Sequence, residues 1–131
     1  MRYILVIALS FVSACQQSTS PAFADRVASA EALENTPAGA LFIGALIKEH
    51  EESINNFATE CYANSAVEKD SFTLVADIDQ AGNLTNVVVQ PESPPTLCYA
   101  EKFARLHTGV SRPANFTSKP IPLVLNVHHS K

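Results

Sequence analysis

The sequence predicts an α+β fold in two layers, with a small antiparallel sheet packed against an N-terminal amphipathic helix and a second helix. Residues 36–62 repeat apolar side chains at spacings of three and four, which is typical of a helix. Residues 72–79 and 121–127 have a period of two and residues 84–90 are rich in β-branched side chains, both typical of strands. The order helix, strand, strand, helix, strand favours a hairpin plus a third strand, covered by helices.

The first fifteen residues indicate export. Arg2 precedes an apolar run from Tyr3 to Val12, and small residues lead from there to Cys15. This pattern resembles a bacterial lipoprotein signal, in which residues 1–14 are removed and Cys15 carries the lipid as the new N-terminus. A helix of ten to twelve residues would be about 15–18 Å long, half of the roughly 30 Å hydrocarbon layer, so we do not expect a membrane span.

Two other interpretations of this start remain open. The small residues around Phe23 fit cleavage after Ala24 by an ordinary signal peptidase, which would leave a periplasmic or secreted chain. The other interpretation is a cytosolic chain with an apolar start. Cys15 stands directly at the end of the apolar run, which favours lipidation, and Gln16 after it resembles outer-membrane sorting in enteric bacteria. We therefore expect a lipid-anchored protein of the cell envelope, with the outer membrane favoured.

Residues 15–35 are expected to form a tether and a possible short helix. The segment 16–21 is polar and has no apolar period, as in a flexible linker. Arg26 to Glu34 is alanine-rich, and Asp25 could cap a helix there, although nine residues are marginal without packing.

The remaining residues, 36–131, suit a single domain. Without residues 1–14 the chain carries eight Lys or Arg against thirteen Asp or Glu, a formal charge of −5. Because phosphate binding needs clustered basic side chains, nucleic acid is disfavoured as a partner.

Three cysteines are present, an odd number that needs an explanation in an exported protein. If Cys15 carries lipid, Cys61 and Cys98 remain as a pair that could form a disulfide in an oxidising compartment. The alternative is that both are buried thiols.

The best helical pattern starts at Thr36, a capping residue followed by Pro37 at the first helical position, and continues to about Tyr62. Its apolar stripe consists of Ile43, Ile47, His50, Ile54, Phe57, Ala58 and Cys61. We expect one amphipathic helix with Cys61 on its buried face.

Phe72 to Asp79 and Leu84 to Gln90 are predicted to form a hairpin around a turn that contains Gly82, because the first alternates in period two and the second is rich in β-branched residues. After Pro91, Thr96 is expected to cap a second helix that ends near Gly109. The last strand, Pro120 to Val127, contains two prolines and is expected at a sheet edge.

The segment 72–127 resembles the C-terminal domain of TonB-type energy transducers. The likeness consists of the Asp79-to-Leu84 turn, the valine strand 87–89, a helix carrying Phe103, the loop 112–116 and the last strand. It departs from that family because a long proline-rich spacer and a lasting membrane helix are missing from the pattern.

The resemblance implies a binding module without catalytic residues or cofactors, in which an extended segment of an envelope protein pairs with a sheet edge. The residues of that edge would be Ile121, Leu123, Val124, Leu125, Asn126 and Val127.

A different class of function uses Asp77 and Asp79 with a histidine, as a small periplasmic hydrolase or a metal-handling protein. Their spacing of two places both carboxylates on one strand face. A solvated face beside a turn is the favoured explanation of both aspartates, and no metal site is expected because neighbours such as His128 and His129 would point to opposite faces.

Overall fold

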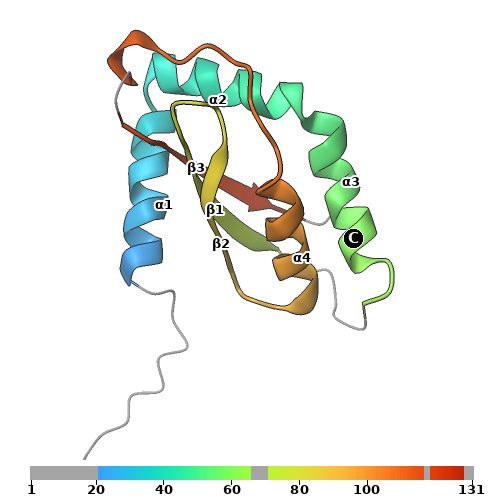
Figure 1. Cartoon of the computed structure of the whole chain (residues 1–131). Helices are drawn as coiled ribbons and strands as arrows, with labels where there is room; N and C mark the ends of the chain where they lie inside the picture. Colours follow the sequence, from blue (N-terminus) through green and yellow to red (C-terminus); the bar gives the residue numbers. More distant parts are fainter. Residues whose placement is uncertain (1–20, 66–70, 117–118, 129–131) are drawn as a thin grey trace, which may run out of the picture.

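The computed structural model describes residues 21–65, 71–116 and 119–128 and confirms the α+β class (Figure 1). The helices are α1 (Pro21–Glu34), α2 (Pro37–Glu49), α3 (Glu51–Tyr62) and α4 (Pro94–Phe103), and the strands are β1 (Phe72–Ile78), β2 (Leu84–Gln90) and β3 (Ile121–Val127). The expected signal peptide and the lipidation site Cys15 lie outside the described residues.

The three strands form one antiparallel sheet in the order β2-β1-β3. The hairpin and the edge position of β3 were both predicted. One face of the sheet packs against α2, α3 and α4, and the buried side chains there include Leu46, Leu74, Tyr99, Phe103 and Leu123. This cluster is the main core.

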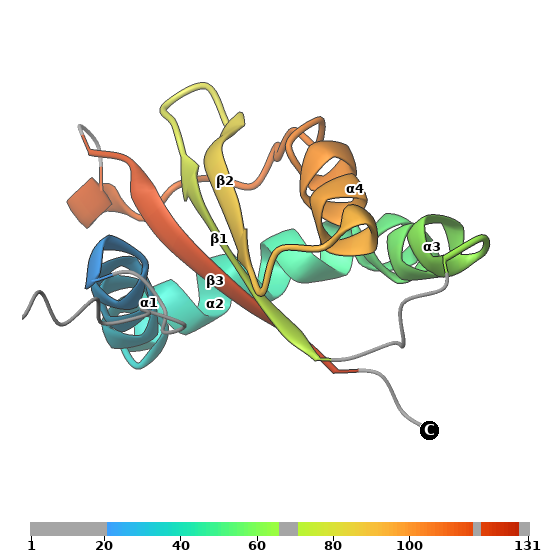
Figure 2. The same cartoon turned by 90° about the horizontal axis from the view of Figure 1, so that it is seen from below.

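The opposite face of the sheet is partly covered by α1, which the sequence left as an uncertain short helix. Figures 1 and 2 show the sheet between α1 on one side and α3 and α4 on the other. Phe23 and Ala30 pack there against Val75 and Val124. The helix begins at Pro21, five residues before the expected start, because Phe23 gains a buried position. Residues 21–34 thus belong to the folded domain and add a partial third layer.

The predicted single helix over residues 36–62 is wrong in one respect, since it breaks at His50 into α2 and α3. Thr36 does cap α2, because its side chain accepts a hydrogen bond from the N–H of Gly39. At the break, the Nε2 atom of His50 lies 2.9 Å from the carbonyl oxygen of His107. This contact joins the α2–α3 corner to the loop after α4. Because His50 and His107 are far apart in the sequence, the apolar period of residues 36–62 does not reveal it.

Helix α4 is shorter than predicted and starts earlier. Ser93, not Thr96, is its N-cap, and the two side chains form a reciprocal capping box. The helix ends at Phe103 and not near Gly109, because the chain turns back to the hairpin and His107 forms a bridge with Asn83.

Candidate functional site

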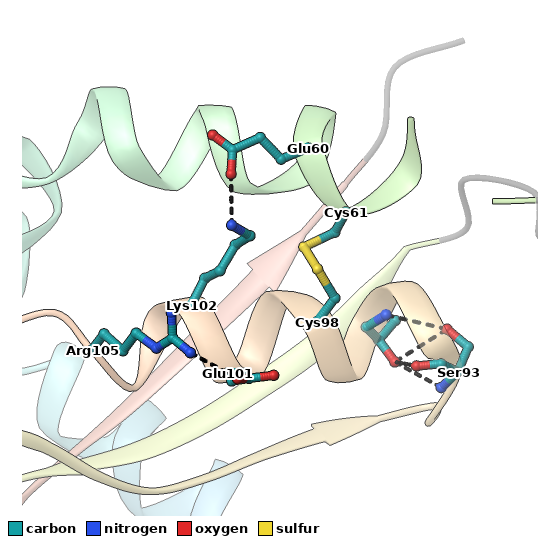
Figure 3. Close-up of a disulfide and its surroundings, with 8 residues drawn as sticks. Glu60, Cys61, Ser93, Cys98, Glu101, Lys102 and Arg105 are labelled. Carbon is teal, nitrogen blue, oxygen red and sulfur yellow. Dashed lines mark hydrogen bonds and ion pairs between the residues drawn. A yellow bond between two sulfur atoms is a disulfide. The ribbon is translucent and has the colours of Figure 1, made fainter. Parts of the chain in front are cut away.

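The expected disulfide is present. Cys61 of α3 and Cys98 of α4 are bonded, with their Cα atoms 5.7 Å apart (Figure 3). Beside them, the Lys102 ammonium lies 2.7 Å from the Glu60 carboxylate. The two helices are thereby fixed to each other at the side of the core.

The predicted partner-binding edge is strand β3. Ile121 and Leu123 are buried in the main core and Val124 in the smaller cluster under α1, while Asn126 is exposed. Leu125 and Val127 are partly buried at the margin of the core. Most side chains of this strand are therefore packed against the rest of the domain. Binding of another chain at this edge would depend on the backbone groups of β3.

The register shows which backbone groups of β3 face outward. Residues of an antiparallel pair alternate between positions that exchange two hydrogen bonds and positions that exchange none. Pro122 lies opposite Asp77 and has no N–H to donate, so this pair is of the second kind. By alternation, Val124 and Asn126 also direct their N–H and C=O groups away from β1.

Two features close the first half of this outer edge. Pro122 offers no donor, and the Glu34 carboxylate at the end of α1 accepts a hydrogen bond from the N–H of Val124. That hydrogen bond favours the charged carboxylate, but burial and the nearby Glu31 outweigh it and raise the pKa of Glu34. While Glu34 accepts from that N–H, a further strand could bond Val124 only through its carbonyl oxygen.

The other edge of the sheet, β2, is interrupted by a β-bulge. Asn86 and Val87 stand opposite the single residue Ala76, and Asn86 has a φ of 51°. The Arg26 guanidinium donates to the carbonyl oxygen of Asn86 at 2.6 Å and fixes this conformation. Bulges twist an edge strand and disfavour pairing with another chain.

The second half of the β3 edge is open and borders a groove. The groove has a volume of about 340 Å³ and lies between α2, α3 and the end of β3. Ile47 and Ile54 contribute from the helices, and Leu125 and Val127 from the strand. Glu51 stands at the same groove. The sequence predicted the apolar character of the two isoleucines, but their position next to the edge depends on the break at His50.

The two aspartates of the alternative function make structural contacts. Asp77 accepts a hydrogen bond from the Asn86 side chain at 3.1 Å and lies 3.5 Å from Arg26. Asp79 follows β1, and its Oδ1 accepts from the N–H groups of Ala81 and Asn83. Bonds to Asn83 above all lower the pKa of Asp79, whereas an acid catalyst needs a raised pKa.

The histidines nearest to a carboxylate lie at the α2–α3 corner. His50 is 3.5 Å from Glu49, and Glu49 also accepts hydrogen bonds from the Thr108 hydroxyl and the Gly109 N–H. These bonds, with that of Thr108 first, lower the pKa of Glu49. Across the described parts of the chain, no three His, Cys, Asp or Glu side chains gather closely enough to hold a metal ion.

No helix within residues 21–65, 71–116 and 119–128 is long and apolar enough to cross a bilayer. Comparison of the chain with models of known protein families, with curated proteins and with solved structures gave no match.

Proposed function

We propose that the protein is a cell-envelope lipoprotein, anchored through Cys15, that binds another envelope protein along the edge of β3 and performs no catalysis. The observation that carries the location is the Cys61–Cys98 disulfide. Disulfides persist in oxidising compartments and are rare in the cytosol. With these two cysteines paired, Cys15 is the one thiol left in the chain, and it stands at the end of the apolar run.

Two observations support a binding role over the hydrolase alternative. Asp77 and Asp79 are held by Arg26, Asn86 and the turn backbone, which leaves them poorly placed to act on a substrate. The edge of β3, in contrast, keeps backbone groups directed outward at Asn126, and such groups bind an added strand.

The α1 helix supports cleavage before Cys15 over cleavage after Ala24. Phe23 is buried with Val75 and Val124, and cutting after Ala24 would remove it from the domain. A mature chain starting at Cys15 keeps the whole of α1 and a polar tether before it.

The experiment is intact-mass measurement of the protein purified from the envelope of its native host, beside a Cys15→Ser variant. We expect the native mass to correspond to a chain starting at Cys15 plus acyl groups, and the variant to keep its signal or lose its membrane association. A chain that retains Met1, with Cys61 and Cys98 reduced, would contradict both the location and the anchor.

Photo-crosslinking in cells tests the binding role. A photo-reactive residue at several exposed positions of the sheet, including Val88 of β2 and Asn126 of β3, should give a crosslink to one envelope protein. The contrary outcome is that the double variant Asp77→Asn with Asp79→Asn loses the cellular function of the wild type while no position gives a crosslink. That outcome would support the hydrolase alternative.

A further inference from the structure

We infer that the open half of the β3 edge, from Leu125 to His128, binds a short extended segment of another protein that alternates apolar residues and carries Lys or Arg. This inference rests on the proposed function and specifies which part of the edge is used and what chemistry the partner segment has. It follows from the backbone register, from two hollows beside the edge and from the charges that line them.

The backbone limits the length of the added strand. Pro122 lacks an N–H and Val124 gives its N–H to Glu34, so neither residue can donate a hydrogen bond to a partner strand. Asn126 is the first residue of β3 whose outward N–H and C=O groups are both left for a ladder. Leu33 of α1 is buried in the main core, so the helix is held in place. Its contact with the first half of the β3 edge is therefore a fixed feature of the fold. The partner segment consequently pairs over only a few residues.

Side chains of an added strand would point alternately to the two faces of the sheet. On the face of the main core they would enter the groove lined by Ile47, Ile54, Leu125 and Val127. These four side chains are only partly buried and form an uncovered margin of the core. An apolar residue at every second position of the partner would complete that margin.

On the other face, the added strand would meet a second hollow beside α1. It is lined by Ala24, Ala28 and Glu31 of the helix and by Thr73 and Asn126 of the sheet. The small alanine side chains leave room for a longer side chain of the partner. Asn126 belongs to both hollows, which places the open edge between them.

The charge of the two hollows selects a basic partner. Glu51 lines the first and Glu31 the second, and among the described residues that line them there is no Lys or Arg. Complementary charges steer association and reject segments of like charge. The same argument disfavours a second copy of this chain as the occupant, because two such edges would bring their glutamates together.

The test uses the chain expressed as the full precursor and purified from envelopes in mild detergent. The probe is a fluorescent peptide of alternating valine and threonine flanked by lysines, and binding is followed by fluorescence anisotropy. The matched control peptide carries glutamate in place of lysine. We expect the lysine peptide to bind about tenfold more tightly than the glutamate peptide.

Three variants locate the site. Glu51→Lys should weaken binding of the lysine peptide about fivefold, whereas Glu52→Lys should leave it within about twofold, because Glu52 is on the same turn of α3 but does not line the groove. Asn126→Pro removes the outward N–H and should weaken binding more than tenfold. Circular dichroism of each variant shows whether the fold is retained, and Glu51→Lys changes only an exposed side chain.

Failure to bind the lysine peptide, equal affinity for both peptides, or equal effects of Glu51→Lys and Glu52→Lys would overturn the inference. So would a dimer that Asn126→Pro dissociates, since a second copy would then fill the edge. If the cellular crosslinks form at Val88 of β2 and not at Asn126, the protein binds a partner, but the choice of the β3 edge and this assignment of the site are both wrong.

Discussion

The Asp79 carboxylate holds the hairpin turn and makes its stability depend on pH. Its Oδ1 accepts hydrogen bonds from the N–H groups of Ala81 at 3.0 Å and Asn83 at 2.8 Å, and the pKa of Asp79 is lowered in the folded protein. A lowered pKa contributes stability above the ordinary value of about 4, and this contribution is lost as the pH falls through the folded-state value. We expect Asp79→Asn to lower the free energy of unfolding at pH 7, measured by urea unfolding, and to lower it much less at about pH 2.5.

The control for this prediction is Glu92→Gln, which changes an exposed carboxylate in the loop before α4. It should leave the urea midpoint unchanged at pH 7. An equal loss for Asp79→Asn at both pH values would show that the hydrogen-bond geometry, and not the charge, stabilises the turn.

At the scale of elements, the α1–α2 corner depends on one glycine. A Cβ atom at Gly39 would lie 2.0 Å from the carbonyl oxygen of Leu33 and 2.8 Å from Oγ1 of Thr36. We expect Gly39→Ala to destabilise the fold by about 1–3 kcal/mol, because the corner must open to admit the methyl group. Gly44→Ala on the same helix is the matched control, since nothing lies within 4 Å there, and it should stabilise by about 0.5–1 kcal/mol. Thermal unfolding of both variants distinguishes the two effects, and a destabilised Gly44→Ala would contradict this account.

The α3–α4 pair depends on the disulfide, whose cysteines are 37 residues apart in the sequence. In the chain-entropy model such a crosslink stabilises the fold by about 4 kcal/mol. The double variant Cys61→Ala with Cys98→Ala should lose most of this free energy in urea unfolding. Chemical reduction should lower the midpoint of the wild type and leave that of the variant unchanged. A variant as stable as the oxidised protein would show that packing alone fixes the two helices.

The strands and the Thr36 cap could be predicted because alternation and capping are local signals. The break at His50 and the early end of α4 could not, since the contacts of His50 with His107 and of His107 with Asn83 join residues far apart in the sequence. The same holds for the candidate site. Pro122 marked β3 as an edge, but no sequence pattern relates Glu34 to the N–H of Val124.

At the scale of the whole molecule, helix α1 decides how much of the sheet is left for a partner. It covers part of one face, its Glu34 occupies the outward N–H of Val124 on the β3 edge, and its Arg26 fixes the bulge of β2. A small sheet with two long free edges tends to pair with other chains and aggregate. In the proposed function, α1 therefore leaves part of one edge to a specific partner and shields much of the remaining sheet from such pairing.

This role predicts that the start of the mature chain affects the stability of the entire domain. A chain beginning at Asp25 lacks Phe23, whose side chain is 5% exposed in the cluster with Val75 and Val124. We expect it to be less stable than a chain beginning at Gln16 by about 3 kcal/mol, the usual cost of deleting a buried phenylalanine. Urea unfolding of both chains measures the difference, and Phe23→Ala in the longer chain should reproduce most of it. Equal stabilities would mean that α1 contributes little to the domain, and the argument for cleavage before Cys15 would lose its structural support.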